Sequence, residues 1–312
     1  MATTSLFVLL DDIVTLLDDI AILSKTATQK TVGVLGDDLA LNAEQVSGFT
    51  ADRELPVVWA VAKGSLINKA ILVPMAMLIS AFIPFAIIPM LVFGGAYLCY
   101  EGFEKVLHSY LHKQTAKENS NELSAHKKLI QAAVQGKEAL IAFEKDKIKG
   151  AIRTDFILSA EIIVIALGVV SGASLFKQFL ALSLIAIAIT VLVYGFVALI
   201  VRMDDVGIYL IKKPAQNLQY IGQKILWLAP RLLKALTIAG TLAMFLVGGG
   251  LLVHNTEFLH HAQTQIASYT NASFLSAIAS TAFEAIVGFT LGGIVFFFII
   301  IAGKLKNIVK YF

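Results

Sequence analysis

The sequence predicts an all-α integral membrane protein with about six transmembrane helices in three hairpins, plus an N-terminal amphipathic helix. Of its 312 residues, 57% are hydrophobic and only 15% are charged, whereas soluble domains average about 45–50% apolar and about 25% charged residues. The apolar residues gather in blocks, and a helix needs about 20 of them to cross a bilayer. In the predicted topology, all 25 Lys and Arg residues except Lys177 lie on one side of the membrane.

The first predicted hairpin covers residues 64–104. Its central part, 70–100, contains no charged side chain, and one helix of that length would exceed the thickness of the hydrocarbon core. Pro84 and Pro89 suit the outer turn, because proline ends a helix and lacks an N–H group. A single span would instead place two basic flanks on opposite faces of the membrane, against the positive-inside rule.

Two further hairpins follow. The second joins spans at about 156–176 and 179–201 through a turn that holds Lys177, and the third joins spans at about 235–254 and 273–302. The loop inside the third hairpin has no Lys or Arg, as expected of an outer loop. We therefore expect both termini in the cytoplasm, together with the basic connections.

The chain divides into two predicted regions. Residues 1–62 are expected to form an amphipathic, interfacial region, because leucines and isoleucines recur at helical spacing over 3–24 between paired aspartates. Residues 63–312 are expected to form the transmembrane bundle. A polar, Lys- and Glu-rich helical insertion at about 109–147 interrupts this bundle on the cytoplasmic side.

Several functional classes are disfavoured. The net charge of +3 is too small to indicate a nucleic-acid partner, and no basic recognition helix is present. The single cysteine, Cys99, allows no disulfide within the chain. The sequence holds no Walker loop, dinucleotide fingerprint, nucleophile elbow or Cys-x-x-Cys motif. We therefore expect no cofactor and no catalytic residues, with the lipid bilayer as the main partner.

Five segments carry a resemblance to a known family. They are LLDDIVTLLDDI at 9–20, TVGVLGDDLALNAEQVSG at 31–48, RELPVVWAVAKG at 53–64, FEKDKIKGAIRTDFILSAE at 143–161 and KALTIAGTLAMFLVGGG at 234–250. Together they resemble the YedI/MutK-type bacterial inner-membrane family over nearly the whole chain. The resemblance implies a multi-pass protein of the bacterial cytoplasmic membrane. It implies no activity and no catalytic residue.

Two glutamates fall at membrane depth. Glu161 lies about two turns into the third predicted span, and Glu284 lies near the middle of the sixth. A charge there costs on the order of 2.5–3.5 kcal/mol by insertion scales, so such residues usually face the bundle interior or a water-filled path. They are candidates for an ion or proton pathway. The alternative is a pair of protonated or Ser/Thr-bonded glutamates that lock helix packing.

Paired aspartates form a second set of candidates. One heptad separates the first two pairs, and a third pair follows Gly36. Carboxylate clusters suit hard divalent cations, so a bound cation is possible. The same side chains could instead pair with lysines or cap helices. The cation-binding candidates are Asp11, Asp12, Asp18, Asp19, Asp37 and Asp38.

A third set lies at the outer end of the fifth span. If the helix continues there, His254, Glu257 and His261 occupy one stripe at i, i+3 and i+7. Imidazole and carboxylate groups at that spacing can bind zinc or a related ion. The zinc-protease motif His-Glu-x-x-His is absent, and ordinary interfacial histidines would produce the same pattern.

Glycines and short repeats bear on packing. Gly168-x-x-x-Gly172 and Gly288-x-x-x-Gly292 permit close helix contact and could support a homo-oligomer. Gly248–Gly250 could either pack closely or unwind its helix.

Short segments of the sequence also repeat. Lys63-Gly64 recurs as Lys149-Gly150 and Ile71-Leu72 as Ile157-Leu158, at one constant offset. Such repeats indicate a possible duplication, and transporters often bind their substrate between repeats.

Three functions are compatible with these features. The first is transport or conduction of a small solute or ion, using the intramembrane carboxylates. The second is a non-transporting scaffold or stress-linked accessory protein that binds partners at its cytoplasmic surface. The third is a membrane-embedded, metal-dependent lipid enzyme at the aspartate-rich interface. The carboxylates at membrane depth favour the first.

Overall fold

The computed structural model describes residues 2–46, 51–112, 137–268 and 273–309, and every regular element in these ranges is a helix. The all-α prediction is therefore confirmed. In chain order the elements are α1 (Ala2–Val46), α2 (Ala51–Phe82), the short 3-10 helix η1 (Pro84–Ala86), α3 (Ile87–His112), α5 (Lys137–Val170), α6 (Leu175–Ile211), α7 (Gln216–Asn255), α8 (Glu257–Ser268) and α9 (Ser273–Val309).

Among the described residues, five stretches are long and apolar enough to cross a membrane, and they lie in α2, η1–α3, α6, α7 and α9. They coincide with five of the predicted spans, so the chain is an all-α membrane protein. The remaining predicted span, 156–176, lies mainly in α5. This helix packs between α1, α2 and α3, but its apolar half also holds Arg153, Asp155 and Glu161.

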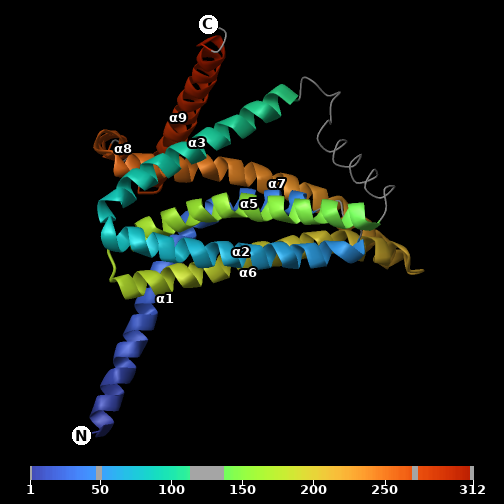
Figure 1. The fold of residues 1–312 in the computed structure, drawn as a ribbon, viewed down its shortest axis with the longest axis horizontal. Coiled ribbons are helices and arrows are strands. Elements are labelled where there is room, and N and C mark those ends of the chain that lie inside the picture. The colour runs from blue at the N-terminus through green and yellow to red at the C-terminus, as the bar shows by residue number, and fades with distance from the viewer. Residues whose placement is uncertain (1, 47–50, 113–136, 269–272, 310–312) are drawn as a thin grey trace.

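The long helices run between two ends of a bundle (Figure 1). At one, the Arg53 end, Arg53 of α2 pairs with Glu144 of α5 at 2.8 Å. At the other, the Pro84 end, η1 begins at Pro84 and connects α2 to α3. Ser80 of α2 donates a hydrogen bond there to Gln178 of α6 at 2.6 Å. The turn predicted at Pro84 is therefore present.

The predicted cytoplasmic insertion is only partly described. Residues 109–112 end α3, and residues 137–147 form the first turns of α5. The centre of the insertion, 113–136, lies outside the described residues. Both described parts are at the Arg53 end of the bundle (Figure 1).

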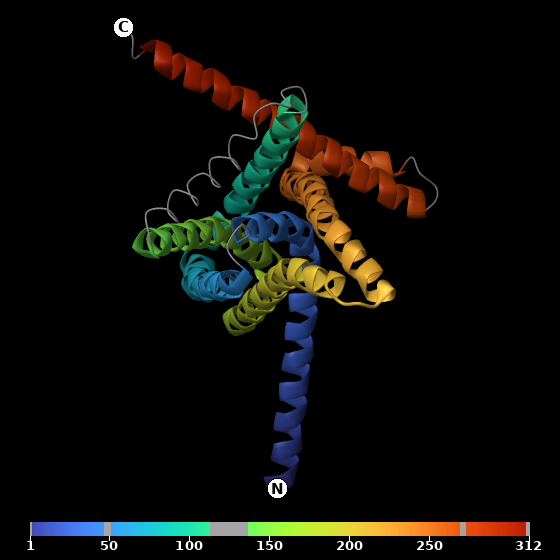
Figure 2. The same cartoon turned by 90° about the vertical axis from the view of Figure 1, so that its right-hand side faces the viewer.

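Helix α1 contributes to the centre of the bundle. Its buried positions recur at intervals of three or four residues, at Ser24, Ala27, Thr31, Leu35, Asp38 and Asn42, with Leu39 and Ala43 beside the last two, and this spacing keeps them on one helical face. The helix packs against α5, α6 and α7. Its first part projects away from the other helices (Figure 2). Part of the region predicted as interfacial thus belongs to the core.

The same helix passes from one end of the bundle to the other. Asp19 pairs with Lys177 at the Pro84 end, with 2.5 Å between Oδ2 and Nζ. Val46 ends the helix shortly before α2 begins at Ala51, next to Arg53. Lys30 lines one pocket together with His254. Lys30 and His254 are thus neighbours of one pocket, although the predicted topology had placed them on opposite sides of the membrane.

Glycines bring α7 and α9 into backbone contact. A Cβ atom added to Gly249 would collide with the carbonyl of Glu284, and one added to Gly288 would collide with the carbonyl of Phe245. Helix α7 continues unbroken through Gly248–Gly250. The close-packing interpretation of these glycines is thus correct, and the unwound-helix alternative is wrong.

The two predicted Gly-x-x-x-Gly motifs also make contacts within the chain. Gly292 lies against the backbone of Cys99 in α3, and Gly168 lies against the side chain of Leu91. No atom lies within 4 Å of a Cβ built on Gly172. Three of the four motif glycines thus hold helices of one molecule together.

We predict that Gly288→Ala destabilises the protein by about 1–3 kcal/mol, because the added methyl group must push α9 away from α7. The matched control is Gly195→Ala in α6, where a Cβ meets nothing within 4 Å. There the substitution should be neutral or stabilising, since alanine favours a helix interior by roughly 0.5–1 kcal/mol. Unfolding of the two purified variants in detergent measures the difference, and equal midpoints would contradict the packing.

Candidate functional site

A buried ion pair lies at the centre of the bundle. Lys69 of α2 and Asp155 of α5 are only 3% and 5% exposed. Lys69 follows Arg53 by 16 residues and precedes Ser80 by 11, which places it about 24 Å and about 17 Å from the two ends at about 1.5 Å per residue. Both charges therefore sit at mid-depth in a protein that spans a membrane.

Two serine hydroxyls bridge the ion pair. Lys69 Nζ and the nearer carboxylate oxygen of Asp155 are 3.7 Å apart. The ammonium group donates to Ser65 Oγ at 2.7 Å and to Ser159 Oγ at 2.8 Å. Each hydroxyl in turn donates a hydrogen bond to the Asp155 carboxylate, Ser65 at 2.8 Å and Ser159 at 3.2 Å. Each serine hydroxyl therefore contacts both the amino group of Lys69 and the carboxylate of Asp155.

The Asp155 carboxylate accepts four hydrogen bonds. Oδ1 accepts from Ser65 and from the Tyr194 hydroxyl at 2.9 Å. Oδ2 accepts from Ser159 and from Asn68 Nδ2 at 3.0 Å. An ionised carboxylate offers about four lone-pair positions, so its acceptor capacity is filled. This hydration-like shell is what permits a charge at this depth.

Helix α1 also contributes side chains to the network. Tyr194 OH, besides donating to Asp155, lies 3.3 Å from Asn42 Oδ1, and Asn42 Nδ2 donates to the carbonyl of Asp38 at 2.8 Å. The Asp38 side chain is buried and interacts electrostatically with Lys69. The network therefore joins α1, α2, α5 and α6 through charged and polar side chains.

The sequence contained one signal for this pair, which the prediction did not use. Lys63-Gly64 recurs 86 positions later as Lys149-Gly150, and the same offset takes Lys69 to Asp155. Helices α2 and α5 run side by side in one direction, as shown by the contact of Arg53 with Glu144 and of Ser65 with Asp155. Residues at equal positions of the repeat therefore face each other.

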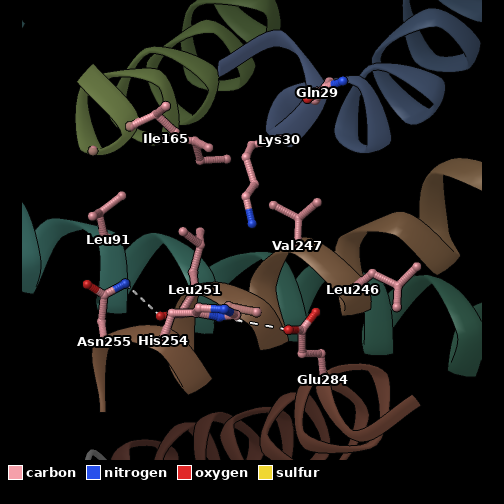
Figure 3. Close-up of a pocket in the computed structure, with 13 residues that line it drawn as sticks. Gln29, Lys30, Leu91, Ile165, Leu246, Val247, Leu251, His254, Asn255 and Glu284 are labelled. Atoms are coloured by element: carbon pink, nitrogen blue, oxygen red, sulfur yellow. Dashed lines mark hydrogen bonds and ion pairs between the residues drawn. The ribbon is translucent and has the colours of Figure 1, made fainter. Parts of the chain in front are cut away.

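A pocket of about 400 Å³ opens beside the predicted residue Glu284 (Figure 3). Gln263 of α8 donates to Glu284 Oε1 at 2.9 Å. His254 Nδ1 lies 3.8 Å from the same oxygen and 2.8 Å from the carbonyl of Gly250, so that nitrogen carries the proton. Lys30 of α1 points its ammonium group into the pocket (Figure 3).

The other predicted glutamate, Glu161, lines a different pocket of about 460 Å³. Its lining is almost entirely apolar. Leu91, Ile165 and Leu251 line both this pocket and the one beside Glu284. The two pockets are therefore neighbours that share an apolar wall, and the two glutamates lie on different sides of it.

Comparison with protein families assigns the chain. Residues 4–298 match the family described as "Protein of unknown function (DUF808)". The chain belongs to the DUF808 family. The matched range includes all of the central network and both glutamate pockets. No curated protein and no solved structure matches this DUF808 chain, so its function must be argued from the site itself.

The predicted histidine–glutamate stripe does not form in this DUF808 protein. It required a continuous helix, but α7 ends at Asn255 and α8 begins at Glu257 after an extended Thr256. His254 turns toward Glu284 instead, and its ring lies 6.0 Å from that of His260. Within the described ranges, no three His, Cys, Asp or Glu side chains gather into a possible metal site. The continuous helix on which that stripe depended is therefore absent, and a metal site at His254, Glu257 and His261 stays a prediction.

The predicted aspartate pairs are dispersed. Asp19 pairs with Lys177, Asp18 is exposed, and Asp38 is buried beside the central network. The side chains of Asp11, Asp12 and Asp37 lie outside the described residues. Of the three candidates whose side chains the structure describes, Asp38 thus reaches the central network, where it interacts electrostatically with Lys69.

We predict that Lys69→Met and Asp155→Asn each destabilise the protein by about 3–5 kcal/mol, because each leaves one buried charge without its partner. The double variant should be more stable than either single variant, because no uncompensated charge then remains. Arg53→Gln with Glu144→Gln serves as the matched control. That pair is partly exposed, and its loss should change stability by about 1 kcal/mol or less.

Reversible unfolding in detergent, followed by tryptophan fluorescence, measures all five proteins. The decisive quantity is the coupling free energy between positions 69 and 155. A double variant no more stable than the less stable single variant would show that the two charges do not compensate each other.

Proposed function

We propose that this DUF808 protein transports or conducts a small solute or ion across the bacterial cytoplasmic membrane. The observation that supports this most directly is the serine-bridged Lys69–Asp155 pair at mid-depth. Intramembrane charges are expensive, and they commonly mark the path of an ion, proton or substrate. A fully apolar contact would hold four helices together without that cost.

The network has the composition of a site that can change its partners. Serine hydroxyls both donate and accept, so each can rotate to serve Lys69, Asp155 or an entering ion. The Lys69 ammonium and the Asp155 carboxylate are 3.7 Å apart, with the hydroxyls bonded between them. A cation that displaces the ammonium from this shell would find four oxygen atoms, from Ser65, Ser159 and Asp155, of the kind that hard cations bind.

Helix α2 also has a weak point beside this site. Pro74 lies in the helix interior and lacks the N–H group that would bond to the carbonyl of Ala70, the residue after Lys69. Proline is a common cause of helix kinks. The backbone next to the ion pair can therefore bend at lower cost than the rest of α2, as a transport cycle requires.

The two glutamates extend the proposed pathway toward the Pro84 end. Glu284 and Glu161 line adjacent pockets that share Leu91, Ile165 and Leu251. We assign them as secondary ion or proton positions. The shared apolar wall is the natural position for a gate between them, since hydrophobic constrictions can close a path by excluding water.

We further propose that the Arg53 end faces the cytoplasm, because most of the Lys and Arg residues lie near that end or in its connections. The C-terminal tail, with Lys304 and Lys306, follows the same rule. Helix α1 passes through the bundle, so its N-terminal segment then lies at the outer face. This revises the expectation of a cytoplasmic N-terminus. The resemblance of the sequence to YedI/MutK-type proteins supports a proposed location in the bacterial inner membrane.

Flux measurements test the proposal. We expect purified protein in liposomes to carry proton or alkali-cation flux when a membrane potential is imposed, measured with an internal pyranine dye and with ion-selective probes. The Lys69→Met/Asp155→Asn double variant should lower this flux at least tenfold. Glu161→Gln/Glu284→Gln should lower it as well, by a smaller factor, because these positions are secondary.

The control is the Arg53→Gln/Glu144→Gln variant, which removes an ion pair of the same type at the end of the bundle and should keep full flux. Absence of flux from the wild-type protein under every gradient would favour the scaffold function. Flux that is unchanged in the central double variant would remove the ion pair from the mechanism.

A further inference from the structure

The pocket beside Glu284 presents two opposite charges that do not pair with each other. Lys30 reaches it from α1 and Glu284 from α9, and both side chains face the same space (Figure 3). No ion pair joins them within the described part of the chain. Opposite charges that share a pocket without contact leave room for a ligand that touches both.

Glu284 is held in place by its neighbours. Gln263, which is buried, donates to Oε1 at 2.9 Å. Gly250 of α7 packs against the same carboxylate, where a Cβ atom would come within 3.3 Å of Oε2. Such fixed surroundings keep the carboxylate aimed into the pocket and lower the entropic cost of binding. The second oxygen, Oε2, has no hydrogen bond among the described residues.

The remaining lining is suited to an apolar group. Leu91, Ile165, Val247 and Leu251 form the walls, and Gly168 lets the side chain of Leu91 pack against α5. The volume of about 400 Å³ falls in the range of roughly 300–1,000 Å³ usual for small-molecule sites. His254 is half-exposed at the rim, so the pocket is reached from the Pro84 end.

We propose that this pocket binds a small zwitterion, with the ligand carboxylate at Lys30, the ligand ammonium at Glu284 and an apolar chain against the leucine and isoleucine walls. A simple cation would be attracted by Glu284 but repelled by Lys30. A simple anion would be attracted by Lys30 but repelled by Glu284. Only a ligand with both charges replaces the water lost by both side chains. Its role as a transported substrate rests on the proposed function, whereas binding itself does not.

Equilibrium binding to the purified full-length protein in detergent tests this inference. The probes are two zwitterions of different charge spacing, L-leucine and 6-aminohexanoate, and two single-charge analogues, hexylamine and hexanoate. We expect at least one zwitterion to bind at least tenfold more tightly than both single-charge analogues, measured by isothermal titration calorimetry. Equal affinity for all four probes, or no binding by any of them, would overturn the proposal.

Substitutions of Lys30 and Glu284 test which group of the ligand each side chain binds. Lys30→Gln should weaken zwitterion binding at least tenfold and should strengthen binding of hexylamine, because the repelling charge is gone. Glu284→Gln should weaken zwitterion binding similarly and favour hexanoate. The matched controls, Lys25→Gln in α1 and Glu257→Gln in α8, remove exposed charges outside the pocket lining and should change nothing. Unchanged unfolding midpoints show that the variants remain folded.

The outcomes of the binding and flux experiments separate the two proposals. Zwitterion binding without flux would retain this site and reject transport. Flux without selective zwitterion binding would retain transport and reject this ligand class. A preference for hexylamine over both zwitterions would identify a plain cation site and would also overturn the inference.

Discussion

The arrangement of the bundle depends on how a lysine and an aspartate are held at mid-depth. Lys69 and Asp155 would each be too costly to bury alone, and even as a pair they do not touch directly. Ser65 and Ser159 form hydrogen bonds with both side chains, and Asn68 and Tyr194 donate the remaining hydrogen bonds to the Asp155 carboxylate. Because these donors come from α2, α5 and α6, the charges can be accommodated only when those helices have docked in one register. Asn42 adds α1 to the same requirement.

This requirement explains why α1 leaves the membrane surface. Its first part projects from the other helices (Figure 2), and Asp19 pairs with Lys177 where the helix meets the bundle. Its second half presents Ala27, Thr31, Leu35, Leu39 and Ala43 to the core, and their small or branched side chains allow close packing. The helix thus combines a polar segment and a packed segment. Glycine contacts between α3, α7 and α9 then complete a second layer, in which Gly95 and Gly248 approach each other's backbone.

Much of the fold was predictable from the sequence because bilayer thickness and charge sorting act on every helix separately. The uncharged stretch 70–100 with its prolines gave the first hairpin correctly, and the span lengths of α6, α7 and α9 followed from hydropathy. The candidate site was only partly predictable. Glu284 was identified as a pocket residue because its own segment is apolar, whereas Lys69 and Asp155 were overlooked because each lies near the edge of an apolar stretch. Their depth depends on helices that extend beyond those stretches.

By itself, the sequence determined the helical class, the membrane location and the positions of most turns, since these follow from local composition and the cost of exposing backbone to lipid. Only the tertiary structure decided which charges meet. It paired Lys69 with Asp155, brought Lys30 and Glu284 to one pocket, and separated Glu161 from Glu284 by an apolar wall. The physical reason is that a buried charge is acceptable only with a partner from another helix, and hydropathy carries no information about which helices become neighbours.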